Sequence, residues 1–327
     1  MAQPRFARRG GFLLVLSALV SLLILPAYAL FDHDDLATGD STLPIAENLS
    51  LTTYKNVAVS GTFSAVDPDG DPLTFRVTKN PARGSITFAE EGSARFTYTP
   101  YENKTGKDSF TYVAEDGQGN VSQPAVVSIK ISKAKTEVTY ADLDGHPAQK
   151  AAIALAEQEI FVGEKLGETW FFRPDAAVSR EEFLAMAMDL VEMDTLPQAQ
   201  LTGFADDDSI SAWAKPYVAS ALRSGMVQGT GAEGERACFA PDRGITGTEA
   251  AVMLNRLLGI SDVADTGSLS QEAAPAWAYQ SVVNLTAVGM LDQTGDGQDL
   301  SQPLTRAQAA ELLLSAMEVL EFRESTW

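Results

Sequence analysis

The chain has 327 residues, of which 45% are hydrophobic, so it is long enough to bury two or three separate cores. Its formal net charge of −20 excludes long-range attraction to nucleic acid or to anionic membranes, and an anionic ligand would have to be held by local, well-placed cations. The single cysteine, Cys238, excludes an internal disulfide.

The N-terminus has the pattern of a secretory signal peptide. Three arginines among the first nine residues precede an apolar run at 11–25, and Ala27-Tyr28-Ala29 fits the small-x-small rule for cleavage. We predict a signal peptide over 1–29, with the mature chain beginning at Leu30. The alternative is a membrane anchor, but the apolar run is short for a bilayer span. We expect no membrane span after cleavage.

An acidic lead-in at 30–42 is predicted to be flexible, and an all-β segment follows at 43–132. In that segment apolar and polar residues alternate, for example around Phe110 and Tyr112. Turn signals such as Asp69-Gly70 separate about seven such runs, and this spacing predicts a β-sandwich.

Two phrases in this segment, at 66–75 and 108–112, resemble the bacterial cadherin-like, immunoglobulin-like repeats of surface proteins. In those families aspartate clusters can bind calcium, which prefers hard oxygen ligands. The candidate calcium ligands here are Asp67, Asp69 and Asp71, with Glu47 or Asp116. The alternative is a turn without a metal, which the incomplete calcium-loop signature favours. Calcium is therefore the one cofactor that the sequence suggests.

After a short polar linker at 133–138, the same helix start occurs three times. Each copy is an apolar residue, then Ser or Thr, then Glu or Gln three positions further on, which is the pattern of a capping box. The copies are Val178-Ser179-Arg180-Glu181-Glu182, Ile245-Thr246-Gly247-Thr248-Glu249 and Leu304-Thr305-Arg306-Ala307-Gln308. An amphipathic helical run follows each copy, and another precedes it. Three helix–loop–helix units at a near-constant period predict a repeat architecture.

These units resemble the S-layer homology repeat over about residues 138–322. The resemblance rests on an aromatic-x-Asp start, a Trp-Ala helix opening, a glycine loop, a Phe-x-Pro-Asp segment and the capping-box motif. These features read here as Phe204-Ala205-Asp206, Trp213-Ala214, Gly225 to Gly229, Phe172-Arg173-Pro174-Asp175 and Leu304 to Gln308. The resemblance implies repeats at 139–200, 201–262 and 263–322, with a tail at 323–327. We expect an all-α domain in which the three repeats pack about a pseudo-threefold axis.

The resemblance also implies a ligand. S-layer homology domains bind secondary cell-wall polysaccharides whose sugars carry a pyruvate ketal, in grooves between repeats. By position, the residues carried over are Arg180 and Arg306 for the carboxylate, with Asp142, Asp206, Trp213, Trp277, Gly163 and Gly229 shaping the groove. A helix N-terminus also offers N–H groups to an anion. The alternatives are solvated arginines paired with a nearby acid, and tryptophans packed in the core.

The sequence departs from the family pattern in each repeat. Gly247 stands where the second repeat should have Arg, Pro147 where the first should have Trp, and Gln271 and Gln308 where the third should have Asp and Glu. One of the three grooves should therefore bind the polysaccharide poorly. We expect that removing Arg180 or Arg306 weakens wall binding and spares folding, and that Gly247→Arg strengthens binding.

Other motifs do not amount to a catalytic or cofactor site. The Gly-x-Gly-x-x-Gly run at 229–234 follows a helix rather than a strand, and the run at 292–297 lacks the final acid of a calcium loop. His33 and His146 form no metal spacing, and Cys238 is expected to be a small buried residue.

The sequence thus predicts a secreted, non-enzymatic protein of the cell wall or S-layer. An immunoglobulin/cadherin-like sandwich is displayed on an anchor that binds secondary cell-wall polysaccharide. Two alternatives stay open: a scaffold of degenerate repeats that binds other surface proteins, and an accessory part of a secreted carbohydrate-active system.

Overall fold

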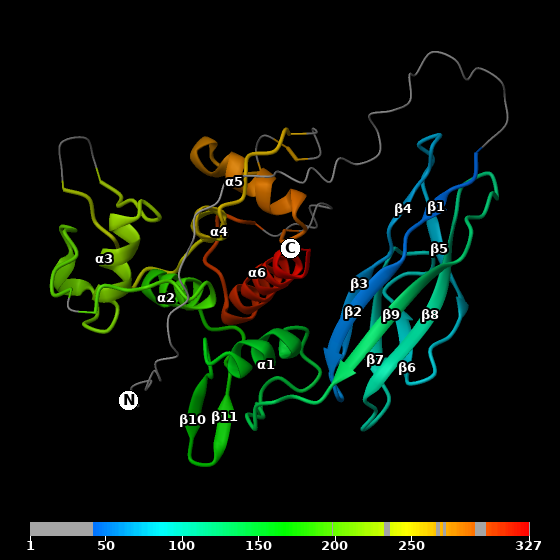
Figure 1. Ribbon diagram of the computed structural model, residues 1–327, viewed down its shortest axis with the longest axis horizontal. Coiled ribbons are helices and arrows are strands. Elements are labelled where there is room, and N and C mark those ends of the chain that lie inside the picture. Colours follow the sequence, from blue (N-terminus) through cyan, green and yellow to red (C-terminus); the bar gives the residue numbers. More distant parts are fainter. Residues whose placement is uncertain are drawn as a thin grey trace. The chain divides into compact units, whose positions relative to one another are not determined.

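The computed structural model describes residues 42–197, 199–231, 236–265, 269–270, 273–291 and 299–326. The predicted signal peptide and nearly all of the lead-in, residues 1–41, lie outside the described residues. The described chain begins with a β-rich part and continues into a mainly helical part (Figure 1).

The β-rich part contains two main sheets. One has the strand order β2-β9-β8-β5 and the other β3-β7-β6, while β1 and β4 pair separately. Strand β2 runs parallel to β9, and the other pairs are antiparallel. The strands are β1 (Ile45–Ala46), β2 (Leu49–Tyr54), β3 (Val59–Thr62), β4 (Ala65–Val66), β5 (Thr74–Lys79), β6 (Gly84–Phe88), β7 (Arg95–Pro100), β8 (Gly106–Glu115) and β9 (Ala125–Ser132).

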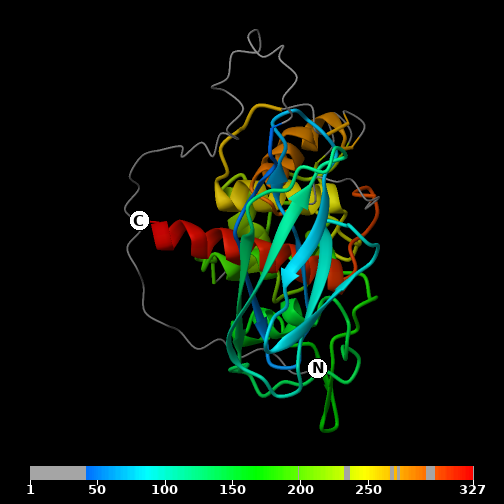
Figure 2. The same ribbon diagram turned by 90° about the vertical axis from the view of Figure 1, so that its right-hand side faces the viewer.

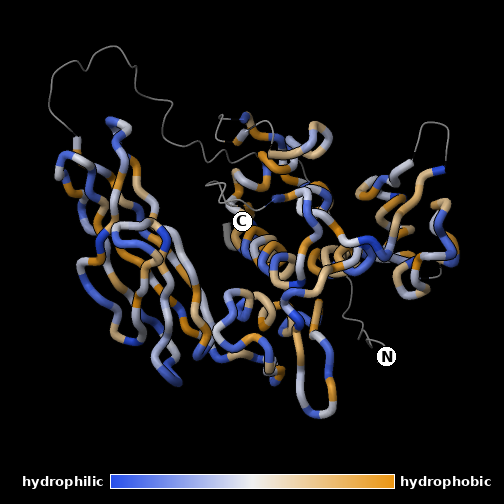
Figure 3. The backbone as a smooth tube through the Cα atoms, turned by 180° about the vertical axis from the view of Figure 1, so that it is seen from behind, coloured by the Kyte–Doolittle hydropathy of each residue, from blue (hydrophilic) through white to orange (hydrophobic). Residues whose placement is uncertain are grey.

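One aromatic core joins the two main sheets. Phe63 stacks on Tyr112 of β8 and on Phe96 of β7, with ring centroids 4.0 and 4.4 Å apart. The buried Tyr112 hydroxyl donates to the carbonyl of Glu47 at 2.6 Å, so its polar end is satisfied. The predicted alternation is confirmed along β9, where buried and exposed residues alternate, and Figure 3 shows hydrophilic and hydrophobic stretches mixed along the β-rich part.

The mainly helical part contains six α-helices within the described residues. They are α1 (Gln149–Glu157), α2 (Arg180–Leu190), α3 (Lys215–Arg223), α4 (Gly247–Leu258), α5 (Ala276–Ala287) and α6 (Arg306–Thr326), with a short 3₁₀ turn η2 (Asp207–Ser209). The longest helix, α6, is seen lengthwise in Figure 2 and packs against α1, α2 and α4.

All three predicted capping boxes are confirmed at the starts of α2, α4 and α6. The hydroxyls of Ser179 and Thr246 each accept the N–H three residues on, and the Glu side chain there accepts the N–H of the cap residue. In the third box Thr305 N–H donates to Gln308 Oε1 at 2.9 Å, and Gln308 N–H donates to the Thr305 hydroxyl at 3.2 Å.

The segments before these helices hydrogen-bond in a closed cycle. Val178 N–H donates to the Leu304 carbonyl at 3.1 Å, Leu304 N–H to Ile245 at 2.8 Å, and Ile245 N–H to Val178 at 3.0 Å. The same three side chains are buried, and the buried residues around them form one apolar core to which helices α1 to α6 all contribute. Each helix start is therefore fixed by its neighbours as well as by its own cap.

The prediction of an all-α anchor domain is wrong. Between α1 and α2 the chain forms an antiparallel hairpin of β10 (Glu164–Leu166) and β11 (Thr169–Phe171). Gly167 opens its two-residue turn with a φ of 63°, a conformation that suits glycine. In the second repeat, Thr230 and Cys238 form an isolated antiparallel bridge, so the region mixes strands and helices.

Candidate functional site

The first candidate site, here called the Arg180 cluster, consists of Arg180, Phe239, Arg243 and Glu249. Arg180 leaves the start of α2 and reaches the second repeat, where its Nε donates to the Phe239 carbonyl at 2.9 Å. Its guanidinium lies over the Phe239 ring and 3.2 Å from Glu249. Arg243 binds the same Glu249 oxygen at 2.5 Å. The Arg180 side chain is 6% exposed, whereas that of Arg243 is 44% exposed.

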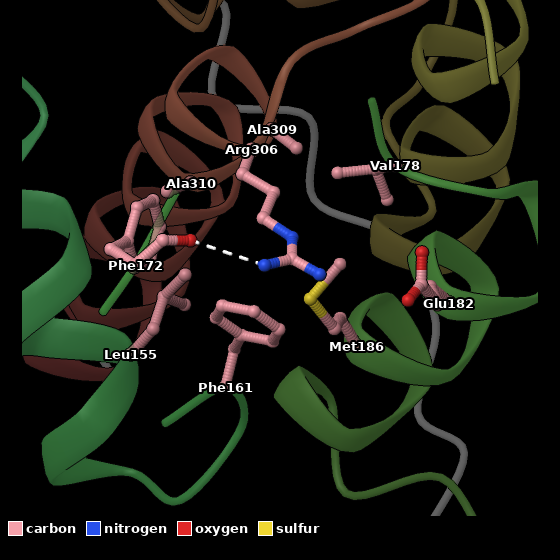
Figure 4. Close-up of a pocket in the computed structure, with 9 residues that line it drawn as sticks. All are labelled: Leu155, Phe161, Phe172, Val178, Glu182, Met186, Arg306, Ala309 and Ala310. Carbon is pink, nitrogen blue, oxygen red and sulfur yellow. Dashed lines mark hydrogen bonds between the residues drawn. The ribbon is translucent and has the colours of Figure 1, made fainter. Parts of the chain in front are cut away.

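The second site, the Arg306 cluster, consists of Arg306, Phe172, Arg173 and Glu164. Arg306 leaves the start of α6, and its guanidinium donates to the Phe172 carbonyl at 3.3 Å, as drawn in Figure 4. The same guanidinium lies 3.2 Å from Glu164, whose other oxygen binds Arg173 at 2.8 Å. Arg306 is 14% exposed and Arg173 is 51% exposed. Both clusters therefore have an inner arginine, buried for Arg180 and partly buried for Arg306, a shared glutamate and a half-exposed outer arginine.

The charges in the Arg180 cluster reinforce one another. Burial opposes ionisation of Glu249, but the hydrogen bond from Arg243 and the charge of Arg180 outweigh it and hold the pKa of Glu249 below its usual value. Burial lowers the pKa of Arg180, although an arginine stays protonated in any case. Each cluster holds two arginines and one glutamate, so each carries one positive charge in surplus.

The helix starts do not offer the N–H groups that the sequence suggested for an anion. At α2, Arg180 N–H donates to the Arg243 carbonyl at 2.9 Å and Glu181 N–H to Pro241 at 3.2 Å. At α6, Arg306 N–H likewise donates to Ala176 at 2.8 Å. These donors are already used between repeats, so a ligand anion at these sites has to be met by side chains.

The two predicted aspartates hold loops. The carboxylate of Asp142 accepts the N–H of Phe172 at 2.9 Å and of Arg173 at 2.7 Å. Asp206 does the same for Phe239 at 2.8 Å and Ala240 at 2.7 Å. Arg173 and Ala240 have φ values of 56° and 59°, which are strained for residues with a side chain. The aspartates thus fix the loop that presents each Phe carbonyl to an inner arginine.

The two predicted glycines allow close backbone packing beside these loops. A Cβ on Gly163 would lie 2.6 Å from the Phe171 carbonyl and 3.1 Å from the Tyr140 ring. A Cβ on Gly229 would lie 2.7 Å from the Phe204 ring. In both clusters, the inner arginine, the predicted aspartate and the predicted glycine therefore contact neighbouring residues of the same loop.

Trp213 and Trp277 are not core residues, and the alternative of core packing is wrong for both. Their exposed fractions are 49% and 61%. Trp213 has an edge contact with Tyr217, with ring centroids 6.5 Å apart.

The second repeat lacks an inner arginine, as the sequence indicates. Gly247, at the position of Arg180 and Arg306, lies instead in a pocket lined by Met290, Leu291, Leu300, Leu304, Gln308, Glu311, Leu312 and Ser315. A Cβ on Gly247 would lie 2.9 Å from Leu300 Cδ2 and 3.1 Å from Leu300 Cα. The position is therefore too close to Leu300 for a simple return to arginine.

The candidate calcium residues form a turn. Asp67 Oδ1 accepts the N–H of Asp69 at 2.9 Å and of Asp71 at 3.2 Å, and Asp71 accepts a hydrogen bond from Gln118 at 3.0 Å. Among the residues that the structure describes, no group of three His, Cys, Asp or Glu side chains is arranged to hold a metal ion. Cys238 is partly exposed rather than buried. The run at 292–297 lies outside the described residues, as do residues 232–234 of the glycine run and Gln271.

Sequence reasoning missed Glu164 and both outer arginines. Arg173 lies inside the Phe-x-Pro-Asp segment, which was the available signal. Arg243 and Glu164 are recognisable only from the contacts between repeats.

Comparison with known families agrees with this architecture. The model for the bacterial Ig domain matches residues 41–130, and the model for the S-layer homology domain matches residues 139–184 and 203–251. The chain therefore contains a bacterial Ig domain followed by S-layer homology domain sequence. Both kinds of domain are non-catalytic, and S-layer homology domains in general bind cell-wall polysaccharide. The S-layer homology match and the similarity to a surface-layer protein place this chain at the cell surface.

Relatives of the chain share only part of its length. It is 39% identical over 89 residues to an amylopullulanase of Thermoanaerobacterium thermosulfurigenes, which covers 26% of this chain and 5% of the relative. It is 28% identical over 127 residues to the surface-layer 125 kDa protein of Lysinibacillus sphaericus, which covers 38% of this chain and 10% of the relative. The chain thus matches about a tenth or less of the length of these curated relatives.

Solved structures show a partial likeness. The SrpA adhesin of Streptococcus sanguinis is 20% identical, with a TM-score of 0.22, over 32% of this chain and 62% of that chain. A likeness at this score carries no functional weight. None of the helices in the described ranges has the combination of length and hydropathy that a bilayer span requires.

Proposed function

We propose that the protein is a non-catalytic anchor that binds, without covalent linkage, an acidic secondary cell-wall polysaccharide bearing pyruvate ketals, and that it displays its immunoglobulin-like domain from the wall. The observation that carries this proposal is the pair of arginine clusters. Each places two guanidinium groups around one carboxylate, at an interface between repeats, in a chain with a net charge of −20. A guanidinium fork matches a carboxylate in shape and charge.

Two clusters suit a repeating polymer. A polysaccharide that carries many carboxylates can engage both clusters of one molecule, and the second contact then forms at a high effective concentration. Weak single contacts therefore add up to firm retention. The half-exposed rings of Trp213 and Trp277 are suited to lie against sugar faces, while the aspartates and glycines maintain the loops.

The test is quantitative co-sedimentation of the purified full chain with cell walls, before and after chemical removal of the secondary polymer. We expect the protein to pellet with intact walls and to stay in solution with stripped walls. Equal pelleting on both would contradict polysaccharide anchoring. If the chain instead pelleted only when wall proteins were retained, it would be a protein-binding scaffold.

A further inference from the structure

The positive charges of the immunoglobulin-like domain gather at one end of the domain, here called the basic end. Strands β2, β5, β7 and β9 finish there, and β3, β6 and β8 begin there (Figure 1). Its loops and strand ends carry six exposed cationic side chains, which are Lys55, Lys79, Arg83, Lys104, Lys107 and Lys130. The opposite end carries exposed carboxylates instead, for example Asp69, Glu90 and Glu91. In a chain with a net charge of −20, the basic end is therefore a local concentration of positive charge.

Two of these lysines lie opposite each other on neighbouring strands. Lys107 of β8 pairs with Lys130 of β9 in the register of the sheet, and both side chains are exposed. Like charges in such a cross-strand pair repel each other and destabilise the sheet. Within the residues that the structure describes, neither ammonium group has an ion-pair or hydrogen-bond partner. An anion bound between the two lysines would remove the repulsion.

Two carboxylates at the basic end are engaged in other bonds. Asp108 accepts the N–H groups of Ala82 and Arg83 at 2.9 and 2.8 Å, and it also accepts the hydroxyl of Tyr98 at 2.8 Å. Glu102 accepts the side-chain amide of its neighbour Asn103 at 3.1 Å. These carboxylates hold the loops of the domain, so the lysines remain available to an external anion.

Hydrogen bonds join the loops of the basic end into one surface. Tyr101 N–H donates to the Arg83 carbonyl at 2.7 Å, and Lys104 N–H donates to the Tyr101 carbonyl at 3.1 Å. Lys55 Nζ donates to Asn103 Oδ1 at 3.2 Å, which links a third loop. The Tyr101 side chain is 50% exposed. The basic end therefore presents an aromatic ring next to cations on loops that are tied together.

Exposed hydroxyl groups continue from the lysine pair along the outer face of the sheet. Ser109 of β8 lies opposite Ser128 of β9, two positions beyond the lysine pair, and Thr52 of β2 lies beside Lys130. All three hydroxyl side chains are exposed. A hydroxyl can both donate to and accept from a sugar hydroxyl, a property that a purely ionic contact does not need. Cations, an exposed aromatic ring and a row of hydroxyls together suit an acidic sugar chain.

We propose that the basic end binds a carboxylate-bearing polysaccharide. The lysines and Arg83 pair with the carboxylates, and the Tyr101 ring lies against the apolar face of a sugar. The hydroxyls of Ser109, Ser128 and Thr52 hydrogen-bond to sugar hydroxyls. The immunoglobulin-like domain is then a glycan-binding module in its own right. This inference goes beyond the anchoring function, and it does not depend on the arginine clusters.

The experiment measures how soluble polygalacturonate protects lysines of the full chain from acetylation, as read by mass spectrometry. Polygalacturonate carries a carboxylate on every sugar. We expect it to protect Lys107 and Lys130, and we expect uncharged dextran to leave both reactive. Added salt should reduce the protection, because screening weakens contacts between exposed charges. The readout is local to the basic end, so binding at the arginine clusters does not contribute to it.

Two matched double variants test the cations. Lys55→Gln combined with Lys104→Gln should raise the polymer concentration that half-protects the lysine pair about fivefold, because two exposed charge contacts are removed. Arg76→Gln combined with Arg223→Gln removes the same charge at exposed positions outside the basic end. This control should leave the half-protecting concentration unchanged, because the local cations are intact.

Tyr101 distinguishes a sugar chain from a simple polyanion. Tyr101→Ala should weaken the protection by polygalacturonate about threefold, because the contact between ring and sugar is lost. The same change should leave any protection by polyphosphate, which has no sugar face, as it is in the wild type. Tyr101→Phe keeps the ring and should behave like the wild type. Melting curves of each variant check that the fold is retained.

Four results would overturn the inference. One is lysines that stay reactive at high polygalacturonate, and another is an equal loss of protection in the two double variants, which would reflect net charge alone. A third is full protection by polyphosphate together with no effect of Tyr101→Ala, which would indicate a general polyanion surface. The fourth is protection that rises with protein concentration without any polymer, which would show that a second copy of the chain occupies the basic end. None of these results involves cell walls, so the anchoring function is tested separately by co-sedimentation.

Discussion

Arg180 and Phe239 are joined across two repeats by a 2.9 Å hydrogen bond from the guanidinium to the backbone carbonyl, although they lie 59 residues apart in the sequence. The same guanidinium neutralises the partly buried Glu249. An arginine that the sequence offers as a ligand contact is therefore also a structural link. Its removal leaves a carbonyl and a carboxylate with fewer partners in a buried site.

The first prediction is that Arg180→Ala destabilises the protein, contrary to the expectation that folding is spared. Breaking a buried ion pair by removing one partner typically costs about 3–5 kcal/mol, and Arg243 still pairs with Glu249, so we expect about 2–3 kcal/mol. Urea denaturation measures the loss. Arg223→Ala, at an exposed site, should change the free energy of unfolding by less than about 0.5 kcal/mol. Equal midpoints for the two variants would contradict the structural role.

The second prediction concerns Asp206, which holds the loop that contains Phe239 and Ala240. Asp206→Ala removes the acceptor of two backbone N–H groups and releases a loop in which Ala240 has a left-handed backbone. The expected destabilisation is about 1–3 kcal/mol. The adjacent exposed Asp208→Ala is the control and should be nearly neutral. Thermal melting of both variants measures the difference, and a similar melting temperature for the two would contradict the stabilising role of Asp206.

Features that depend on residues close together in the sequence were predictable, whereas features that depend on contacts between distant segments were not. The capping boxes were predictable because the cap and its acid are three residues apart. The β10–β11 hairpin was missed because strands of three residues give too short an alternation to detect. The exposure of Trp213 and the burial of Arg180 depend on which repeats pack together, which local patterns do not contain.

The third prediction is a pH effect centred on Glu249. Its pKa is lower in the folded protein than in the unfolded chain, so its stabilising contribution is present above the unfolded value and is lost as the pH falls through the folded value. Glu249→Gln keeps a capping residue, as Gln308 does in the third box, but loses the charge that pairs with the arginines. We expect it to lower stability near pH 7 and to flatten the decline in melting temperature as the pH falls below the usual pKa of a glutamate.

Glu182→Gln provides the matched control for this effect. Glu182 fills the same capping-box position in α2. Its substitution should leave both the melting temperature and the acid decline close to those of the wild type. Identical acid profiles for Glu249→Gln and the wild type would contradict the role assigned to the pair.

The fourth prediction tests whether the loop of Asp67 binds calcium or is a turn without a metal. Asp67 Oδ1 accepts two backbone N–H groups of its own loop, so Asp67→Ala should lower the melting temperature of the immunoglobulin-like domain whether or not calcium is present. Calcium binding to the native state would instead raise the melting temperature of the wild type by mass action. Melting curves with millimolar calcium and with a chelator separate the two, and a rise with calcium would establish the metal site.

The last prediction concerns Gly247 and Leu300. Alanine is a better helix former than glycine, so Gly247→Ala at the start of α4 would be favourable on propensity alone. A Cβ there, however, lies 2.9 Å from Leu300 Cδ2, 3.1 Å from Leu300 Cα and 3.2 Å from the Leu300 carbonyl oxygen, so Leu300 has to shift. Overpacking of this kind costs about 1–3 kcal/mol, and we expect Gly247→Ala to be destabilising.

Leu300→Ala should relieve part of this conflict, because it removes the Cδ2 contact and leaves those of the Leu300 Cα and carbonyl oxygen at 3.1 and 3.2 Å. In a double-mutant cycle the combined variant should be more stable than the sum of the single changes predicts, with a coupling of about 1 kcal/mol or more. The same steric reason means that Gly247→Arg alone should not strengthen wall binding, whereas Gly247→Arg combined with Leu300→Ala lacks the closest of the three contacts. Additive free energies of unfolding for the two alanine changes would show that Leu300 does not exclude a side chain at position 247.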